Sequence, residues 1–261
     1  MTTIRAPAVA GSFYPGDGSH LREMVRRMLA EHPSGNKPPK AIIVPHAGYI
    51  YSGPVAASAY AQVAGGRDII HRVVLLGPSH RVPFHGLATT GVGGFATPLG
   101  IVTVDKPAVQ LLTTLPQLQI LDQAHAWEHS LEVQLPFLQL ALDHFTLVPL
   151  VVSGTSAQAV SEVLSLVWGG PETLIVVSSD LSHYHDYTTA LAMDRATSEA
   201  INAMRSDGID ADHACGSEAV NGLLRAAQQH GLRAETLDLR NSGDTAGPRD
   251  RVVGYGAYAF H

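Results

Sequence analysis

The chain contains three short runs of aliphatic, mostly β-branched residues, and a histidine or an aspartate follows shortly after each of them. They span residues 41–44, 73–76 and 174–177, and proline, glycine or serine follows each of them. Continuous apolar runs of about four to eight residues with such boundaries are typical of strands buried in a parallel sheet. Helical patterns alternate with them, so we predict an α/β fold: a single domain with a mostly parallel central sheet and helices on both faces.

The remaining elements follow from periodicity and from proline and glycine positions. A proline favours the first turn of a helix, so Pro54 is expected to begin one, whereas Pro136 is expected to kink or divide another. Further strands are expected at 145–151, 232–239 and 252–260, with a hairpin within 89–104. Helices are expected at about 19–32, 107–115, 130–142, 158–168, 188–204 and 216–229.

Composition and charge limit the classes of protein to which this chain can belong. Hydrophobic residues make up 45% of the 261 residues and charged residues 15%, so a sizeable core is expected. The net charge of −6 comes without a basic stripe, which argues against nucleic acid as a partner. The N-terminal residues do not have the pattern of a signal peptide, and no apolar run is long enough for a membrane span, so a cytoplasmic protein is expected. The single cysteine, Cys215, cannot form an internal disulfide.

The ends of the three central strands carry the residues most suited to chemistry. His46, His80 and the pair Asp180 and His183 each come shortly after one of these strands. Open α/β sheets bind ligands at the carboxyl edge of their parallel strands, so these side chains are expected to converge there. Converging imidazoles predict a metal site or an acid–base site.

Two of these loops suggest further roles. The loop after the first strand contains glycines that let backbone approach a ligand, and its Tyr49 and Tyr51 are expected to line the pocket. In the third loop, Asp180 is expected either to orient His183 or to act with it as a base. The alternative for Asp180 is a helix cap beside solvated histidines.

Two other segments remain ambiguous from the residues alone. Glu128 and Glu132 are spaced one turn apart near a predicted helix N-terminus, where the helix dipole favours acidic residues. The dipole does not account for His129 at the same place, so we include His129 in the site. Cys215 precedes a predicted helix, where a thiolate is favoured. A lone cysteine is nevertheless more often an inert buried residue, and the sequence alone favours that alternative.

The order of motifs resembles the MEMO family, whose bacterial and archaeal branch is called AmmeMemoRadiSam system protein B. The resemblance runs through most of the chain. It is carried by the segments 5–15 (RAPAVAGSFYP), 45–49 (PHAGY), 76–80 (LGPSH), 128–132 (EHSLE), 178–183 (SSDLSH), 215–216 (CG) and 254–260 (GYGAYAF).

The resemblance implies one MEMO-like domain over 1–261, with a fold like the class III extradiol ring-cleaving dioxygenases. It places His46 and His80 as metal ligands and Cys215 as the third ligand, where those dioxygenases have a carboxylate. It places His183 as the catalytic histidine, with His129 and Asp180 as other site residues. Iron(II) is the expected cofactor, although a thiolate also suits copper or zinc.

Three functions are consistent with this resemblance. The first is a non-haem iron(II) dioxygenase-like oxidoreductase that acts on a catechol-type aromatic diol. The second is a non-catalytic metal-binding or adaptor protein, concerned with iron or copper handling or with peptide binding. The third is a metal-assisted hydrolase. The family name also suggests a functional link to a radical-SAM protein and an AMMECR1-like protein, and a domain of this size often forms an oligomer.

Overall fold

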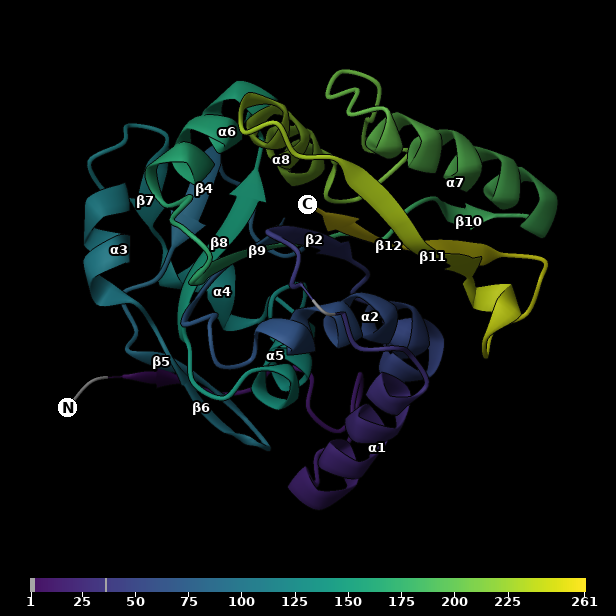
Figure 1. Ribbon diagram of the computed structural model, residues 1–261, viewed down its shortest axis with the longest axis horizontal. Helices are drawn as coiled ribbons and strands as arrows, with labels where there is room; N and C mark the ends of the chain where they lie inside the picture. The colour runs from purple at the N-terminus through teal and green to yellow at the C-terminus, as the bar shows by residue number, and fades with distance from the viewer. Residues whose placement is uncertain (1–2, 36) are drawn as a thin grey trace.

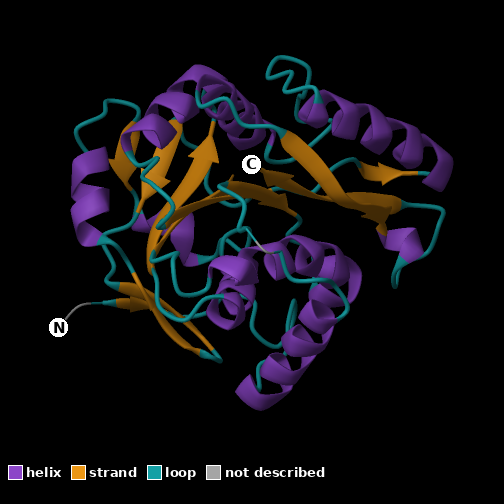
Figure 2. Ribbon diagram, viewed as in Figure 1, coloured by secondary structure: helices purple, strands orange, loops and turns teal. Residues whose placement is uncertain are grey.

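The fold is organised around one large mixed sheet with helices on both faces (Figures 1 and 2). The computed structural model describes residues 3–35 and 37–261. Within them, the main sheet has the strand order β10-β12-β2-β9-β3-β8-β4-β7, and β11 also pairs with β12. These strands are β2 (Ala41–Val44), β3 (Arg72–Pro78), β4 (Gly86–Thr89), β7 (Leu118–Ile120), β8 (Thr146–Ser153), β9 (Thr173–Ser178), β10 (His183–His185), β11 (Ala234–Asn241) and β12 (Val252–Phe260).

The centre of the sheet is parallel, as the sequence predicts. Strands β2, β9, β3 and β8 lie side by side with parallel pairing. The flanking strands β12 and β4 run antiparallel to β2 and β8, respectively. The three strands that precede His46, Asp180 and His80 are therefore direct neighbours, and their carboxyl ends meet at one edge.

The alternation of side chains along β2 explains why both faces of the sheet are covered. Ile42 and Val44 face the core formed with α1 (Gly18–Ala30), α2 (Tyr49–Val63) and α5 (Leu135–Ala141). Ala41 and Ile43 face the opposite core. The helices on that second side are α3 (Lys106–Leu112), α6 (Ala157–Leu166), α7 (Tyr187–Asn202) and α8 (Ser217–Gln229).

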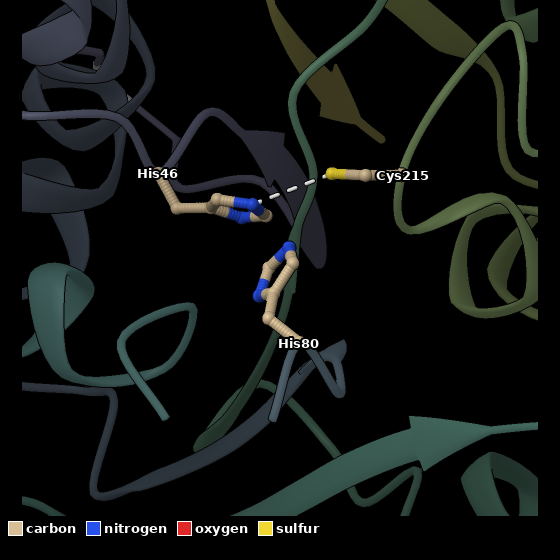
Figure 3. Close-up of side chains that lie close together, drawn as sticks. All are labelled: His46, His80 and Cys215. Atoms are coloured by element: carbon tan, nitrogen blue, oxygen red, sulfur yellow. Dashed lines mark hydrogen bonds between the residues drawn. The ribbon is translucent and has the colours of Figure 1, made fainter. Parts of the chain in front are cut away.

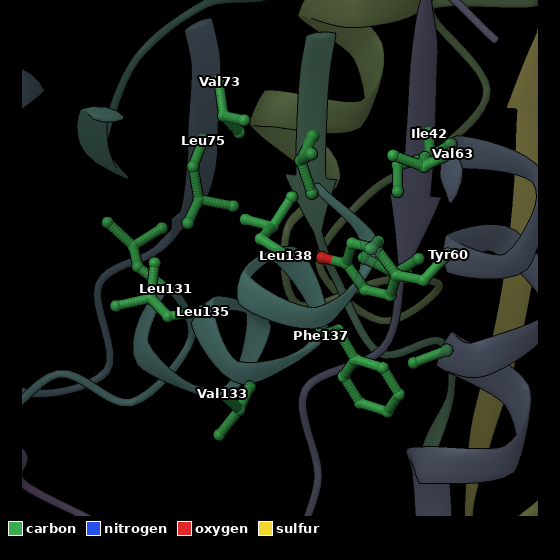
Figure 4. Close-up of a cluster of buried hydrophobic side chains, with 14 of the residues drawn as sticks. Ile42, Tyr60, Val63, Val73, Leu75, Leu131, Val133, Leu135, Phe137 and Leu138 are labelled. Carbon is green, nitrogen blue, oxygen red and sulfur yellow. The ribbon is translucent and has the colours of Figure 1, made fainter. Parts of the chain in front are cut away.

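The first core contains the aromatic packing that anchors α2 to α5 (Figure 4). The rings of Tyr60 and Phe137 are stacked with centroids 5.1 Å apart. Both side chains are fully buried. Burying one large apolar side chain stabilises the folded state by about 1.5–3 kcal/mol. The packing fixes α5 against α2, and the segment that leads into α5 carries site residues.

Two predicted helix starts differ from the structure. Helix α2 begins at Tyr49, so Pro54 lies inside it. The proline removes one backbone hydrogen bond, the one to the carbonyl of Ile50. Ile50 is 61% exposed. The helix predicted at 130–142 begins later, as the 3-10 turn η2 (Glu132–Gln134) followed by α5, with Pro136 in the first turn of α5. A proline is tolerated there because its missing N–H would be unpaired in any case.

The N-terminal arm is tied to the body of the protein by the buried carboxylate of Glu132. Arg5 forms an ion pair with Glu132 at 2.7 Å, and the backbone N–H groups of Ala8 and Val9 donate to the same carboxylate. The hydroxyl of Tyr14 donates to its other oxygen, Oε1, at 2.6 Å. Glu132, which the sequence analysis paired with Glu128 on one helix face, therefore has a structural role.

A small sheet and two short helices complete the described part of the chain. The small sheet contains β1 (Ile4–Arg5), β5 (Gly94–Thr97) and β6 (Gly100–Thr103), and β5 and β6 form the expected hairpin. The short helices are α4 (Asp122–Ala126) and η3 (Ser242–Asp244), besides the 3-10 turn η1 (Ala64–Gly66). Among the described residues, no helix has both the length and the apolar character needed to cross a bilayer.

Candidate metal centre

His46, His80 and Cys215 come together at the carboxyl edge of the sheet (Figure 3). His46 follows β2, His80 follows β3, and Cys215 lies just before α8. One ligand atom from each residue lies within 4.8 Å of the other two. The fold therefore brings together three side chains from distant parts of the sequence, with their donor atoms directed at one another.

Hydrogen bonds fix which nitrogen of His46 is free. The hydroxyl of Ser178 donates to the carbonyl of Ser130 at 2.6 Å, so its oxygen can only accept from its other neighbours. The Nδ1 of His46 lies 3.0 Å from that oxygen and is therefore assigned the proton. This leaves the Nε2 of His46 unprotonated and facing the Sγ of Cys215, 3.3 Å away. Burial, reinforced by nearby His80, lowers the pKa of His46 to about 3, so the ring is neutral at pH 7.

Glu128 orients His80 in the same way. Its carboxylate accepts from the backbone N–H of His80 at 2.6 Å and lies 2.9 Å from the Nδ1 of that ring. It also accepts from the backbone N–H groups of His129 and Ser130. Burial disfavours the charge, but these hydrogen bonds, led by His80, outweigh it and lower the pKa of Glu128 to about 2. An ionised carboxylate behind Nδ1 leaves the Nε2 of His80 for a metal.

Contrary to the sequence-based expectation of a thiolate at the start of α8, the surroundings of Cys215 favour the protonated thiol in the absence of a metal. Burial, together with the carboxylate of Asp180, raises the pKa of its thiol to about 12. Its Sγ also lies 3.7 Å from the carbonyl oxygen of Asp180. A bound cation would supply the charge that a thiolate needs at this position.

The separation of two of the three donors matches that of adjacent ligands on a metal ion. Metal–nitrogen bonds of about 2.1 Å and metal–sulfur bonds of about 2.3 Å place two adjacent ligand atoms about 3.1–3.6 Å apart. The distance of 3.3 Å between the Nε2 of His46 and the Sγ of Cys215 lies within that range. A second group, His80, Glu128 and His129, is equally close. In that group, however, the carboxylate is already occupied by hydrogen bonds, which favours the first group as the ligand set.

The candidate ligands lie in a pocket of about 780 Å³, a volume typical of small-molecule sites. Of the other site residues predicted from the sequence, His129, Asp180, His183 and Tyr51 line it as well. The ring of His129 is stacked on that of His80 with centroids 4.6 Å apart. Burial, with a contribution from His46, lowers the pKa of His129 to about 4.

Two sequence-based expectations differ from the structure. Tyr49 does not line the pocket: it is 3% exposed in the core, because it lies in the first turn of α2 and its hydroxyl donates to the carbonyl of Val133. Asp180 is not hydrogen-bonded to His183 among the described residues. Its carboxylate instead accepts from the backbone N–H of His46 at 2.7 Å and so holds the loop that carries this ligand. Burial raises the pKa of Asp180.

The structure also adds pocket residues that the sequence analysis did not identify. Phe13 lies against the ring of His129 with centroids 4.8 Å apart. Tyr255 on β12 and the exposed Tyr184 and Arg251 line the same pocket. Phe13 and Tyr255 belong to motifs that the resemblance includes, but no local pattern marks Tyr184 and Arg251. They reach the pocket only because β12 and β10 pair beside β2.

The fold and this cluster define an α/β protein with a candidate metal site at the carboxyl edge of its parallel strands. The family model described as "Memo-like protein" matches residues 5–259, so the chain belongs to the Memo family. Similar proteins support this assignment. A MEMO1 family protein of Aquifex aeolicus is 35% identical over 97% of both chains, and one of Nitrosopumilus maritimus is 33% identical over 98% of this chain and 99% of its own.

Replacing Glu128 with glutamine is expected to lower the affinity for a metal ion about 10–100-fold. An amide lacks the charge that holds the Nδ1 proton of His80, and its NH₂ group would face backbone donors. Competition titration with zinc and a chelator measures the change. The control is Glu218→Gln, since Glu218 accepts from the backbone of Thr155 and not from a site histidine. Equal affinities for the two variants would contradict the orienting role.

Metal binding is expected to release one proton from Cys215. With its thiol pKa raised to about 12, the affinity should rise about ten-fold for each pH unit between about 7.5 and 9. His46, with a lowered pKa of about 3, is already deprotonated over this range and adds no slope. Zinc titrations at several pH values, corrected for the chelator, give the slope. A flat profile, or an unchanged slope in Cys215→Ser, would contradict the prediction.

Proposed function

We propose that this protein is a non-haem iron(II) enzyme of the dioxygenase type that acts on a catechol-type aromatic diol. The observation that carries the proposal is the cluster of His46, His80 and Cys215 in the lining of a pocket large enough for an aromatic ring. Three protein ligands leave coordination positions for a bidentate diol and for oxygen. Iron(II) would supply the electrons that activate oxygen toward the bound ring.

The residues around the ligands suit the handling of a diol. Neither ring nitrogen of His183 is hydrogen-bonded to a side chain or backbone group in residues 3–35 and 37–261, and the ring lines the pocket. His183 is therefore the residue to accept a hydroxyl proton from the substrate. His129, packed between Phe13 and His80, is held in place to form a hydrogen bond with a ligand.

The pocket walls suit an aromatic ligand. Phe13, Tyr51 and Tyr255 provide ring faces and edges around the cluster. Aromatic side chains contribute apolar contact together with a preferred ring geometry, which favours a flat ligand over a flexible one. A copper or zinc ion would be held by the same three residues, because the thiolate is a soft ligand. The identity of the ion therefore decides between oxygen chemistry, hydrolysis and binding without turnover.

The proposal is tested by loading the metal-free protein with iron(II) under anaerobic conditions and adding a panel of catechols and then oxygen. We expect oxygen uptake and the absorbance of a ring-opened product. His183→Gln should retain iron and lose about 100-fold or more of kcat. His185→Gln, in the same pocket, is the matched control and should retain activity. Iron-loaded protein that consumes no oxygen with any diol would refute the enzymatic proposal and favour a metal-binding role.

A further inference from the structure

Arg251 is the one lysine or arginine among the described residues that line the pocket. It precedes β12 on the segment that follows η3, and it is exposed. Its guanidinium lies over the ring of Tyr184, 4.9 Å from the ring centroid. Within residues 3–35 and 37–261 it makes no side-chain hydrogen bond or ion pair, so its N–H donors are available to a ligand.

The other arginines of this region are engaged differently. Arg249 contacts Asp244 at 3.9 Å, lies over the ring of Tyr187 and donates to the carbonyl of Gly243. Arg240 is paired with Asp238. These two guanidinium groups are at least partly satisfied within the protein. Arg251 lines the pocket and has no such partner in the part of the chain that the structure describes, so it is free to bind a group there.

The position of the Tyr184 ring under Arg251 depends on an irregular backbone. Tyr184 has a φ of +62°, which is uncommon for a residue other than glycine. It lies where the register between β10 and β12 shifts, because His183 pairs with Val253 whereas His185 pairs with Val252. Such bulges redirect a side chain and are frequent beside active sites. The same three-residue strand thus presents His183 to the site and the Tyr184 ring to the guanidinium.

We propose that Arg251 is a specificity-determining residue that binds a carboxylate on the substrate, so that the substrate is an anionic aromatic diol. The inference rests on the proposed function, since the diol occupies the metal end of the same pocket. A guanidinium presents N–H donors in a plane that matches a carboxylate, and stacking on Tyr184 leaves that plane open.

The acidic residues of the pocket do not occupy Arg251. The carboxylate of Asp180 accepts from the backbone N–H of His46, and neither Asp180 nor Asp212 forms an ion pair with Arg251. The pocket that holds the metal cluster therefore also contains an unpaired guanidinium, which can bind the anionic substituent of a diol.

The test compares 3,4-dihydroxyphenylacetate with 4-ethylcatechol. These ligands share the diol and a methylene spacer, and they differ in the carboxylate. Both are titrated calorimetrically onto the iron-loaded protein without oxygen. We expect the native protein to bind the carboxylate-bearing diol at least about ten-fold more tightly, as one charge-assisted hydrogen bond would provide. Arg251→Gln should abolish the preference while leaving the affinity for 4-ethylcatechol unchanged, and Arg251→Lys should retain part of it.

The control variant is Arg249→Gln, which removes a neighbouring exposed arginine and should leave the preference intact. An equal affinity for the two diols in the native protein, or a preference that survives in Arg251→Gln, would overturn the role of Arg251 and leave the proposed function standing. Failure of both diols to bind would instead overturn the proposed function and, with it, this inference.

Discussion

Replacing Cys215 with serine is expected to lower the affinity for iron(II) by about 100-fold or more. Removing a residue that only orients a metal ligand typically costs about 10–100-fold. The serine hydroxyl has nearly the same shape as the thiol but does not ionise near neutral pH, so the ion loses an anionic ligand. His46→Ala should have a comparable effect, because it removes the nitrogen 3.3 Å from that sulfur. Elemental analysis after anaerobic purification, with chelator competition, measures both variants.

The control for these variants is His20→Ala, since His20 is an exposed histidine on α1 far along the chain from the strand ends. It should retain a full complement of metal. Stoichiometric iron in Cys215→Ser would exclude the thiolate as a ligand. It would also direct attention to the neighbouring group of His80, Glu128 and His129.

Replacing Glu132 with alanine is expected to reduce the free energy of unfolding by about 3–5 kcal/mol, the usual cost of breaking one side of a buried ion pair. The side chain of Glu132 is 0% exposed and that of Arg5 is 5% exposed. The variant leaves the charge of Arg5 without its ion-pair partner, although its guanidinium still donates to two backbone carbonyls. It also leaves the hydroxyl of Tyr14 and the backbone N–H groups of Ala8 and Val9 without their acceptor. Denaturant unfolding measures the loss.

A surface pair provides the comparison. Arg67 and Asp143 form an ion pair whose side chains are about half exposed, and Asp143→Ala should cost about 0–1 kcal/mol. The double variant Arg5→Met/Glu132→Leu should recover part of the loss, because it removes the unpaired charge but not the unpaired donors. A loss below about 1 kcal/mol for Glu132→Ala would contradict the structural role of this carboxylate.

The central strands were predictable because each is a continuous apolar run with a clear boundary. Residues 41–44 form β2 with the predicted bounds, and the strands at 73–76 and 174–177 extend by one or two residues at their ends. The start of α2 was predicted wrongly because Pro54 is a local signal, whereas the helix begins where backbone contacts with Phe13 fix Tyr49. The antiparallel flanks of the sheet depend on long-range pairing that no local pattern encodes.

The candidate ligands were predictable for a different reason. His46 and His80 follow strands that the sheet forces together, so parallel topology alone favoured their meeting. Cys215 follows no strand, and only the family resemblance singled it out. The orienting role of Glu128 depends on a turn in which one carboxylate faces four donors, an arrangement that spacing does not reveal.

The attachment of the N-terminal arm limits when one wall of the pocket can form during synthesis of the chain. Arg5, Ala8 and Val9 are synthesised before Glu132, whose carboxylate anchors them and which lies more than 120 positions further along the chain. Phe13 cannot pack against His129 until this distant segment has been synthesised, so one wall of the pocket forms only after that point. Closing such a long loop carries an entropic cost that grows slowly with length, which the buried contacts must offset. This wall of the pocket therefore depends on contacts between segments that are synthesised far apart in time.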